Sequence, residues 1–203
     1  MVSGRGRAMV AMSGGVDSSV AALLLREQGY DVAGVTMRLG LPGNDDVHQG
    51  SGRAEELSDA RRVCDACGIP HHVLDCAEPF QEHVVADFRE QYRKGRTPNP
   101  CVRCNRYLKF GLLLAWARAQ EYDCLATGHY ASIVAQEGRW FLRRAADRSK
   151  DQSYFLYGIE RAGLGDILFP LHGLTKDEVR RLAVGAGLPV AERSESQDLC
   201  FAG

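Results

Sequence analysis

The sequence predicts an α/β domain built around a largely parallel sheet. Over most of the 203 residues, apolar segments of strand length alternate with segments that repeat apolar residues at helical spacing. A glycine-rich turn follows the first apolar run and leads into the first helical segment, as is typical at the edge of a parallel sheet. With 45% hydrophobic and 25% charged residues, the composition excludes wholesale disorder, collagen and coiled coil.

The individual elements follow from the apolar spacing and from the breaker residues between them. The predicted strands are 8–12, 30–38, 71–74 and 122–127, and a small hairpin is expected at 133–135 and 140–142. The predicted helices are 16–28, 54–68, 77–93, 104–120 and 175–186, with a short helix at 151–157. Thr175, followed three residues later by Glu178, predicts a capping box. We expect a main domain over 1–145 and a smaller, mostly helical extension over 146–203.

Charge and cysteine usage narrow the class of protein. The chain has 25 Lys+Arg against 26 Asp+Glu, a net charge of −1, which excludes a strongly basic tail but not a local basic patch. No apolar run approaches the ~18 residues of a membrane span, and the first residues lack the apolar core of a signal peptide. Seven cysteines, an odd number, argue against a secreted disulfide framework. We therefore expect a cytoplasmic protein with reduced thiols and no membrane association.

The turn at residues 13–19, with the sequence SGGVDSS, has the features of an anion site. Glycines let the backbone approach an anion, and the following helix adds unpaired N–H groups and a positive dipole end. The hydroxyls of Ser13, Ser18 and Ser19 can donate to phosphate oxygens, whereas Asp17 suits a Mg²⁺ ion bound to those phosphates. The segment is neither a Walker A loop nor a G-x-G-x-x-G turn.

The cysteines divide into candidate reactive thiols and core residues. Cys104 falls at a predicted helix start beside Arg103 and Arg106, which predicts a lowered pKa and a reactive thiol. The pairs Cys64-x-x-Cys67 and Cys101-x-x-Cys104 have the spacing of a zinc ribbon, although the first pair lies inside a predicted helix. We interpret that first pair as packing thiols, and likewise the two remaining cysteines outside the C-terminal segment, Cys76 and Cys124.

Two stretches of the chain are strongly basic. Residues 89–109 contain seven basic residues and one acid, a net +6. Residues 139–150 contain five basic residues and one acid, a net +4. Such stretches suit a phosphate backbone, although a solvated helix face is the plain alternative. The first stretch surrounds Cys104, which favours a nucleic-acid substrate.

Five motifs in order along the chain resemble one family. They are AMSGGVDSSVAA at 11–22, RTPNPCVRCNRYLKF at 96–110, ATGHYA at 126–131, KDQSYFLY at 150–157 and SQDLCF at 196–201. The first resembles the signature of the PP-loop pyrophosphatase superfamily, and together they resemble the tRNA-specific 2-thiouridylases. The resemblance implies ATP-dependent 2-thiolation of the tRNA wobble uridine: ATP, with Mg²⁺, adenylates the C2 carbonyl oxygen, and a persulfide then supplies sulfur.

The resemblance also assigns residues. It implies that Cys200 carries the persulfide and that Cys104 attacks it, with tRNA and a cysteine desulfurase or sulfur-relay protein as partners. The implied ATP site comprises Ala11, Met12, Ser13, Gly14, Gly15, Val16, Asp17, Ser18, Met37 and Gly128. The implied tRNA contacts are Asn99, Pro100, Cys101, His129, Lys150, Asp151 and Gln152. Members of the family continue past SQDLCF, so 146–203 is expected to be a tRNA-contacting linker and the start of a truncated second domain.

Three alternatives stay open. Cys101 stands where many thiouridylases have an aspartate, and Cys101, Cys104 and Cys200 could instead hold a [4Fe–4S] cluster with one open iron. A second alternative is another PP-loop ATP-dependent ligase, such as an NAD⁺ or GMP synthetase, which has no use for the two sulfur cysteines. The third is a non-catalytic, zinc-dependent RNA-binding module.

Overall fold

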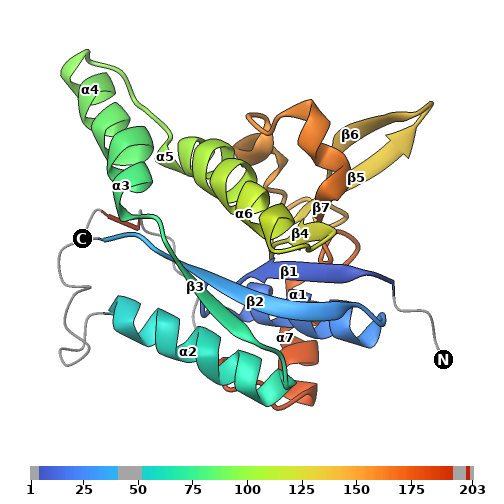
Figure 1. The fold of residues 1–203 in the computed structure, drawn as a ribbon. Helices are drawn as coiled ribbons and strands as arrows, with labels where there is room; N and C mark the ends of the chain where they lie inside the picture. The colour runs from blue at the N-terminus through green and yellow to red at the C-terminus, as the bar shows by residue number, and fades with distance from the viewer. Residues whose placement is uncertain (1–4, 41–51, 194–199, 202–203) are drawn as a thin grey trace.

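The structure, a computed structural model, describes residues 5–40, 52–193 and 200–201, with the backbone alone described at 52–54. It confirms the α/β fold with a parallel sheet flanked by helices (Figure 1). Five parallel strands lie in the order β3-β2-β1-β4-β7. Their bounds are β1 Arg7–Ala11, β2 Asp31–Arg38, β3 His71–Asp75, β4 Cys124–Ala126 and β7 Ile167–Leu168.

Helices cover both faces of this sheet because the side chains of each strand alternate between two cores. On β1, Val10 joins the core beneath α1, α2 and α7, whereas Met9 joins the core beneath η2 and α6. In Figure 1 the first three helices lie below the sheet and the other two above it. Their bounds are α1 Val16–Glu27, α2 Gly52–Cys67, α7 Lys176–Gly185, η2 Cys104–Leu113 and α6 Leu114–Ala119.

Two helices predicted as uninterrupted are built from shorter pieces. The first comprises α3 Ala77–Phe80, the π-helix η1 Gln81–Ala86 and α4 Asp87–Arg93. The second begins with α5 Pro100–Arg103 and continues through the π-helix η2 into α6. Asn99 caps α5, because its Oδ1 accepts from the N–H groups of Cys101 and Val102 at 3.1 and 3.3 Å. The helix therefore starts four residues before the predicted position.

The remaining elements complete the sheet edge and the C-terminal part. The hairpin is confirmed as β5 Ala131–Gln136 and β6 Arg139–Arg144, and the short helices are η3 Ser153–Leu156 and η4 Arg161–Asp166. The strand β7 was not predicted, because two residues are too short to show a period. The boundary at residue 145 stays a prediction, although β7 pairs with β4 and α7 packs on α1 beyond it.

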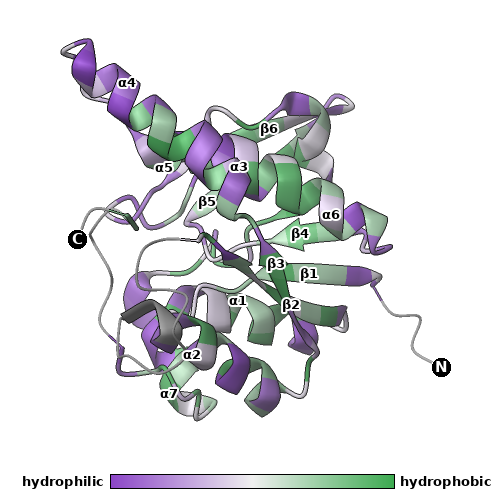
Figure 2. Ribbon diagram, turned by 60° about the vertical axis from the view of Figure 1, so that its left-hand side comes forward, coloured by the Kyte–Doolittle hydropathy of each residue, from purple (hydrophilic) through white to green (hydrophobic). Residues whose placement is uncertain are grey.

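Hydropathy follows this layering. Figure 2 shows apolar residues along the central strands and polar residues on α4, which projects from the body and has no buried residue. The expected capping box at the start of α7 is present. Within the described part of the chain, no helix combines the length and apolar character needed to cross a membrane.

The strand order fixes where a ligand can bind. β1 pairs with β2 on one side and with β4 on the other, so the chain leaves the carboxyl ends of β1 and β4 in different directions. In open α/β sheets a crevice forms at that point. The SGGVDSS turn follows β1, and Gly128-His129 follows β4.

Candidate functional site

A cavity of about 440 Å³ lies at this edge of the sheet and gathers most of the predicted site residues. From the ATP set it is lined by Ala11, Met12, Ser13, Asp17, Ser18, Met37 and Gly128. From the sulfur and tRNA sets it is lined by Cys104, Cys200, Pro100, Cys101, His129 and Gln152. Five motifs that are distant in sequence thus meet around one space.

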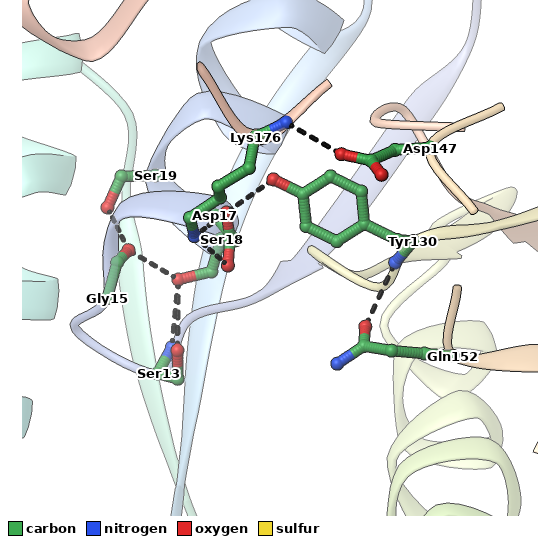
Figure 3. Close-up of polar contacts among 9 residues, drawn as sticks. All are labelled: Ser13, Gly15, Asp17, Ser18, Ser19, Tyr130, Asp147, Gln152 and Lys176. Atoms are coloured by element: carbon green, nitrogen blue, oxygen red, sulfur yellow. Dashed lines mark hydrogen bonds and ion pairs between the residues drawn. The ribbon is translucent and has the colours of Figure 1, made fainter. Parts of the chain in front are cut away.

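The turn is held in shape by its own hydroxyls (Figure 3). The Ser18 Oγ accepts from the Ser13 N–H at 3.2 Å and donates to the Gly15 carbonyl at 3.1 Å. Ser13 is exposed to the cavity, as expected of a phosphate ligand. The expectation for Ser19 was wrong, because this side chain is fully buried and its hydroxyl donates to the Gly15 carbonyl at 2.8 Å.

Two glycines allow the close packing that positions the turn. Gly14 has φ +73°, and a Cβ there would lie 2.3 Å from the Glu56 carbonyl oxygen of α2. At Gly128 a Cβ would lie 2.7 Å from the backbone nitrogen of Ser18. Gly128 therefore serves the contact between the end of β4 and the first turn of α1, in addition to lining the cavity.

Asp17 has a partner that sequence reasoning missed. The Lys176 Nζ lies 2.7 and 2.8 Å from its two carboxylate oxygens, and the Tyr130 hydroxyl donates to Oδ1 at 2.9 Å (Figure 3). Lys176 is the first residue of α7 and is buried. Its backbone N–H donates to Asp147 at 3.2 Å. No sequence signal separates this lysine from the other basic residues of α7.

The ion pair bears on the expected Mg²⁺ site. Both oxygens of Asp17 contact Lys176, so they are engaged in this conformation. Arg193 adds a second cation near the turn, donating to the Gly14 carbonyl at 3.3 Å and pairing with Asp59. The turn is thus bracketed by two basic residues from the C-terminal part of the chain.

His129 is half-buried and lines the cavity. Its Nδ1 lies 2.7 Å from the Thr127 Oγ1, and its ring packs between Phe110 and Phe169 with centroids 6.0 Å away in each case. Burial, together with the nearby Lys109 charge, lowers the pKa of His129 well below its usual value. The imidazole is therefore neutral at pH 7.

Cys104 differs from its predicted environment. It sits in the second turn of a helix that starts at Pro100, and only 9% of its surface is exposed. Burial raises the pKa of its thiol, with Lys109 opposing this rise. The prediction that a helix N-terminus and Arg103 would lower the pKa of the Cys104 thiol was therefore wrong. Arg103 instead pairs with Asp87 at 3.3 Å.

The other two cavity cysteines are exposed. Cys101 lies in the first turn of α5, and Cys200 lies in the short described segment near the C-terminus. All seven cysteines fall within the described residues, and none of them forms a disulfide. In that same part of the chain, no three His, Cys, Asp or Glu side chains form a group that could hold a metal ion. The geometry therefore gives no support to a cluster on Cys101, Cys104 and Cys200.

The remaining cysteines are core residues, as predicted. Cys64 and Cys67 are buried inside α2, and burial raises the pKa of both thiols, that of Cys64 to about 12. Cys76 and Cys124 are also buried, and burial raises their pKa values to about 11 and about 12. Cys64 and Cys67 thus pack inside α2 and Cys124 inside β4, whereas Cys76 is the N-cap residue of α3.

Several predicted tRNA contacts have partners within the chain. Asn99 caps α5, and the Asp151 carboxylate accepts from the Ala145 N–H and the Ser153 hydroxyl at 2.9 and 2.7 Å. Gln152 accepts from the Tyr130 N–H at 3.0 Å (Figure 3). These bonds orient the loop beside the cavity. The cavity does not include Gly14, Gly15, Val16, Asn99, Lys150 or Asp151.

Comparison with known proteins places these features in a family. A family model described as the tRNA methyl transferase HUP domain matches residues 6–203. MnmA 1 of Syntrophus aciditrophicus, named a tRNA-specific 2-thiouridylase, is 58% identical over 195 residues, which cover 96% of this chain and 52% of the relative. MnmA of Thermus thermophilus, with the same name, is 52% identical over 204 residues, covering 96% and 54%.

A solved structure shares the fold. A 4-thiouridine synthetase in complex with RNA and bound ATP matches with a TM-score of 0.63 and 20% identity, covering 97% of this chain and 45% of that one. At this identity the likeness concerns the fold alone. The chain spans about half the length of the curated relatives it matches. It belongs to the tRNA methyl transferase HUP domain family, with the tRNA-specific 2-thiouridylases as its relatives, as the five motifs predicted.

Proposed function

We propose that this chain carries the ATP and sulfur-transfer site of an enzyme that 2-thiolates uridine at the wobble position of tRNA. One observation carries the proposal: the SGGVDSS turn and the cysteines Cys104 and Cys200 line the same cavity. A ligase that transfers ammonia needs the turn but neither cysteine. Adenylation of a base and delivery of sulfur to the same base require the turn and the two cysteines to lie within reach of one another.

The residues of the turn suit the phosphates of ATP. The exposed Ser13 hydroxyl and the N–H groups at the start of α1 are donors, and the helix dipole favours the anion. Mg²⁺ would enter with the nucleotide and neutralise charge on its phosphates. Asp17 would reach that ion only after Lys176 leaves its carboxylate. Met37, near the end of β2, lines the same cavity and would contact the base of the nucleotide.

The chemistry follows from the poor leaving ability of a carbonyl oxygen. Transfer of AMP to the C2 oxygen of uridine releases pyrophosphate and makes that oxygen part of a good leaving group. The terminal sulfur of a persulfide on Cys200 attacks C2, and AMP departs. Cys104, as a thiolate, then attacks the Cys200 sulfur, which forms a Cys104–Cys200 disulfide and releases 2-thiouridine.

The substrate and partners follow from the same steps. The target base must leave its stack to enter the cavity, where Pro100, Cys101 and His129 would contact it. The exposed arginines of β6 and the following loop, Arg139, Arg143, Arg144 and Arg148, suit a tRNA backbone. A cysteine desulfurase or a sulfur-relay protein must load Cys200, and a reductant must reopen the disulfide after each cycle.

The test is the Cys200→Ser variant, incubated with unmodified tRNA, ATP, Mg²⁺ and a sulfur source. We expect loss of 2-thiouridine by mass spectrometry, with ATP binding retained by calorimetry. Cys124→Ser is the control, because this buried thiol lies in β4 outside the cavity lining. Undiminished thiolation in Cys200→Ser would contradict the proposal, and so would ammonia transfer by the unmodified enzyme.

A further inference from the structure

Lys109 is a half-buried basic residue in the cavity wall. It lies near enough to Cys104 and His129 for its charge to act on both. In the part of the chain that the structure describes, no carboxylate and no hydrogen-bond acceptor pairs with its ammonium group. A cation held in a cavity without a counter-charge is a site for an anion.

The other basic side chains near the cavity differ in this respect. Arg38 pairs with Asp75 at 2.5 Å, and Lys176 pairs with Asp17 at 2.7 Å. Their charges are already balanced by carboxylates of the chain. Among the lining residues that the structure describes, Lys109 is thus the lysine or arginine whose charge remains available to a ligand or to a reacting group.

The π-helix η2 is what turns Lys109 toward Cys104. Residues five apart point about 140° away from each other around an α-helix. A π-helix closes its hydrogen bonds over five residues, so residues 104 and 109 lie on nearly the same side. Gly111 fits this backbone, because a Cβ there would lie 2.9 Å from the carbonyl oxygen of Arg106, five residues earlier. Widened helical turns of this kind are frequent at functional sites.

We propose that Lys109 is a positioning residue for sulfur transfer, whose ammonium group holds anionic sulfur next to Cys104 inside the cavity. The anions are the Cys104 thiolate and the terminal sulfur of an incoming persulfide. The identity of the persulfide rests on the proposed function. The presence of a cation that holds an anion at Cys104 does not depend on that function, and alkylation and thiosulfate binding test it without tRNA.

The surroundings of Cys104 require such a cation. Burial disfavours its thiolate, and thiolate is the form that attacks sulfur. His129 cannot supply the charge, because its imidazole is neutral in this environment. Arg106 is exposed, so solvent screens its charge, whereas Lys109 is half-buried and lines the same cavity as Cys104.

The experiment compares two alkylating reagents of similar size, anionic iodoacetate and neutral iodoacetamide, at one pH. The rate of Cys104 modification is measured for each by peptide mass spectrometry. In Lys109→Met we expect the ratio of the iodoacetate rate to the iodoacetamide rate to fall about fivefold or more. Lys109→Arg should restore it. Arg106→Met, which removes an exposed charge from the same helix, should leave it unchanged.

A second measurement does not need Cys104 to be accessible. Thiosulfate, a small sulfur-containing dianion, should raise the melting temperature of the unmodified protein and of Arg106→Met more than that of Lys109→Met. An unchanged alkylation ratio in Lys109→Met, or equal thiosulfate shifts in all three proteins, would overturn the proposal. If these effects appear while no tRNA is thiolated, the anion site stands and the proposed function fails.

Discussion

Replacement of Lys176 by methionine tests the ion pair between α7 and Asp17 of the SGGVDSS turn. Breaking a buried pair by removing one partner costs about 3–5 kcal/mol, because the other charge stays buried without compensation. The Lys176 side chain is 10% exposed, but that of Asp17 is 31% exposed. Solvent therefore screens part of the remaining charge, and we expect a loss of about 2–3 kcal/mol in the free energy of unfolding.

Urea unfolding followed by circular dichroism measures this loss directly. For a chain of this size the loss corresponds to a fall of about 4–12 °C in melting temperature. Lys94→Met is the matched control, since Lys94 pairs with Glu90 on the surface, with both side chains more than half exposed, and should change stability by less than about 0.5 kcal/mol. The double variant Asp17→Asn/Lys176→Met should recover part of the loss, because no buried charge is left alone.

A change below about 0.5 kcal/mol in Lys176→Met would refute the reasoning. It would mean that the Asp17 carboxylate is solvated well enough to do without a partner. The reasoning would also be contradicted if the double variant lost more unfolding free energy than the two single variants lose together. The ion pair would then not be the source of the effect.

Two further predictions concern packing and pH. Gly128→Ala should lower stability by about 1–3 kcal/mol and weaken ATP binding, because the new Cβ would lie 2.7 Å from the Ser18 backbone nitrogen. Gly173→Ala, where a Cβ meets nothing within 4 Å, is the control, and equal melting temperatures would count against the argument. The pKa of Cys64 is raised from 9.0 to about 12 in the fold, so its stabilising contribution is complete below pH 9 and is lost as the pH rises toward 12. Urea unfolding between pH 9 and 11 should therefore show a pH slope that is smaller in Cys64→Ala by about 1.4 kcal/mol per pH unit. Identical slopes would show that this thiol titrates alike in the folded and unfolded chains.

The parts of the fold that were predicted are those with a local signal. Apolar runs gave four of the five strands, and the SGGVDSS turn marked the crevice, because glycines and a helix start are visible in a short window of sequence. The capping box of α7 was likewise predicted from Thr175 and Glu178. Site residues that the motifs carry, such as Ser13 and Cys104, do meet at one cavity.

The parts that were missed depend on geometry that α-helical spacing does not encode. Asn99 starts the helix four residues early, which moves Cys104 from a helix N-terminus into a buried second turn. The π-helix then brings Lys109 beside Cys104, where an α-helical pattern would have placed it elsewhere. The partner of Asp17 lies 159 residues away in sequence, and no local pattern reports such a contact.

That separation has a consequence for how the protein is made. A ribosome releases β1, the SGGVDSS turn and α1 long before it reaches Lys176, so the turn first exists with the Asp17 charge uncompensated. The neutral pair forms only when α7 emerges and packs on α1. The nascent chain must therefore keep an immature crevice at the SGGVDSS turn until α7 has been synthesised. Nucleotide should stabilise the released chain more than any intermediate that ends before α7.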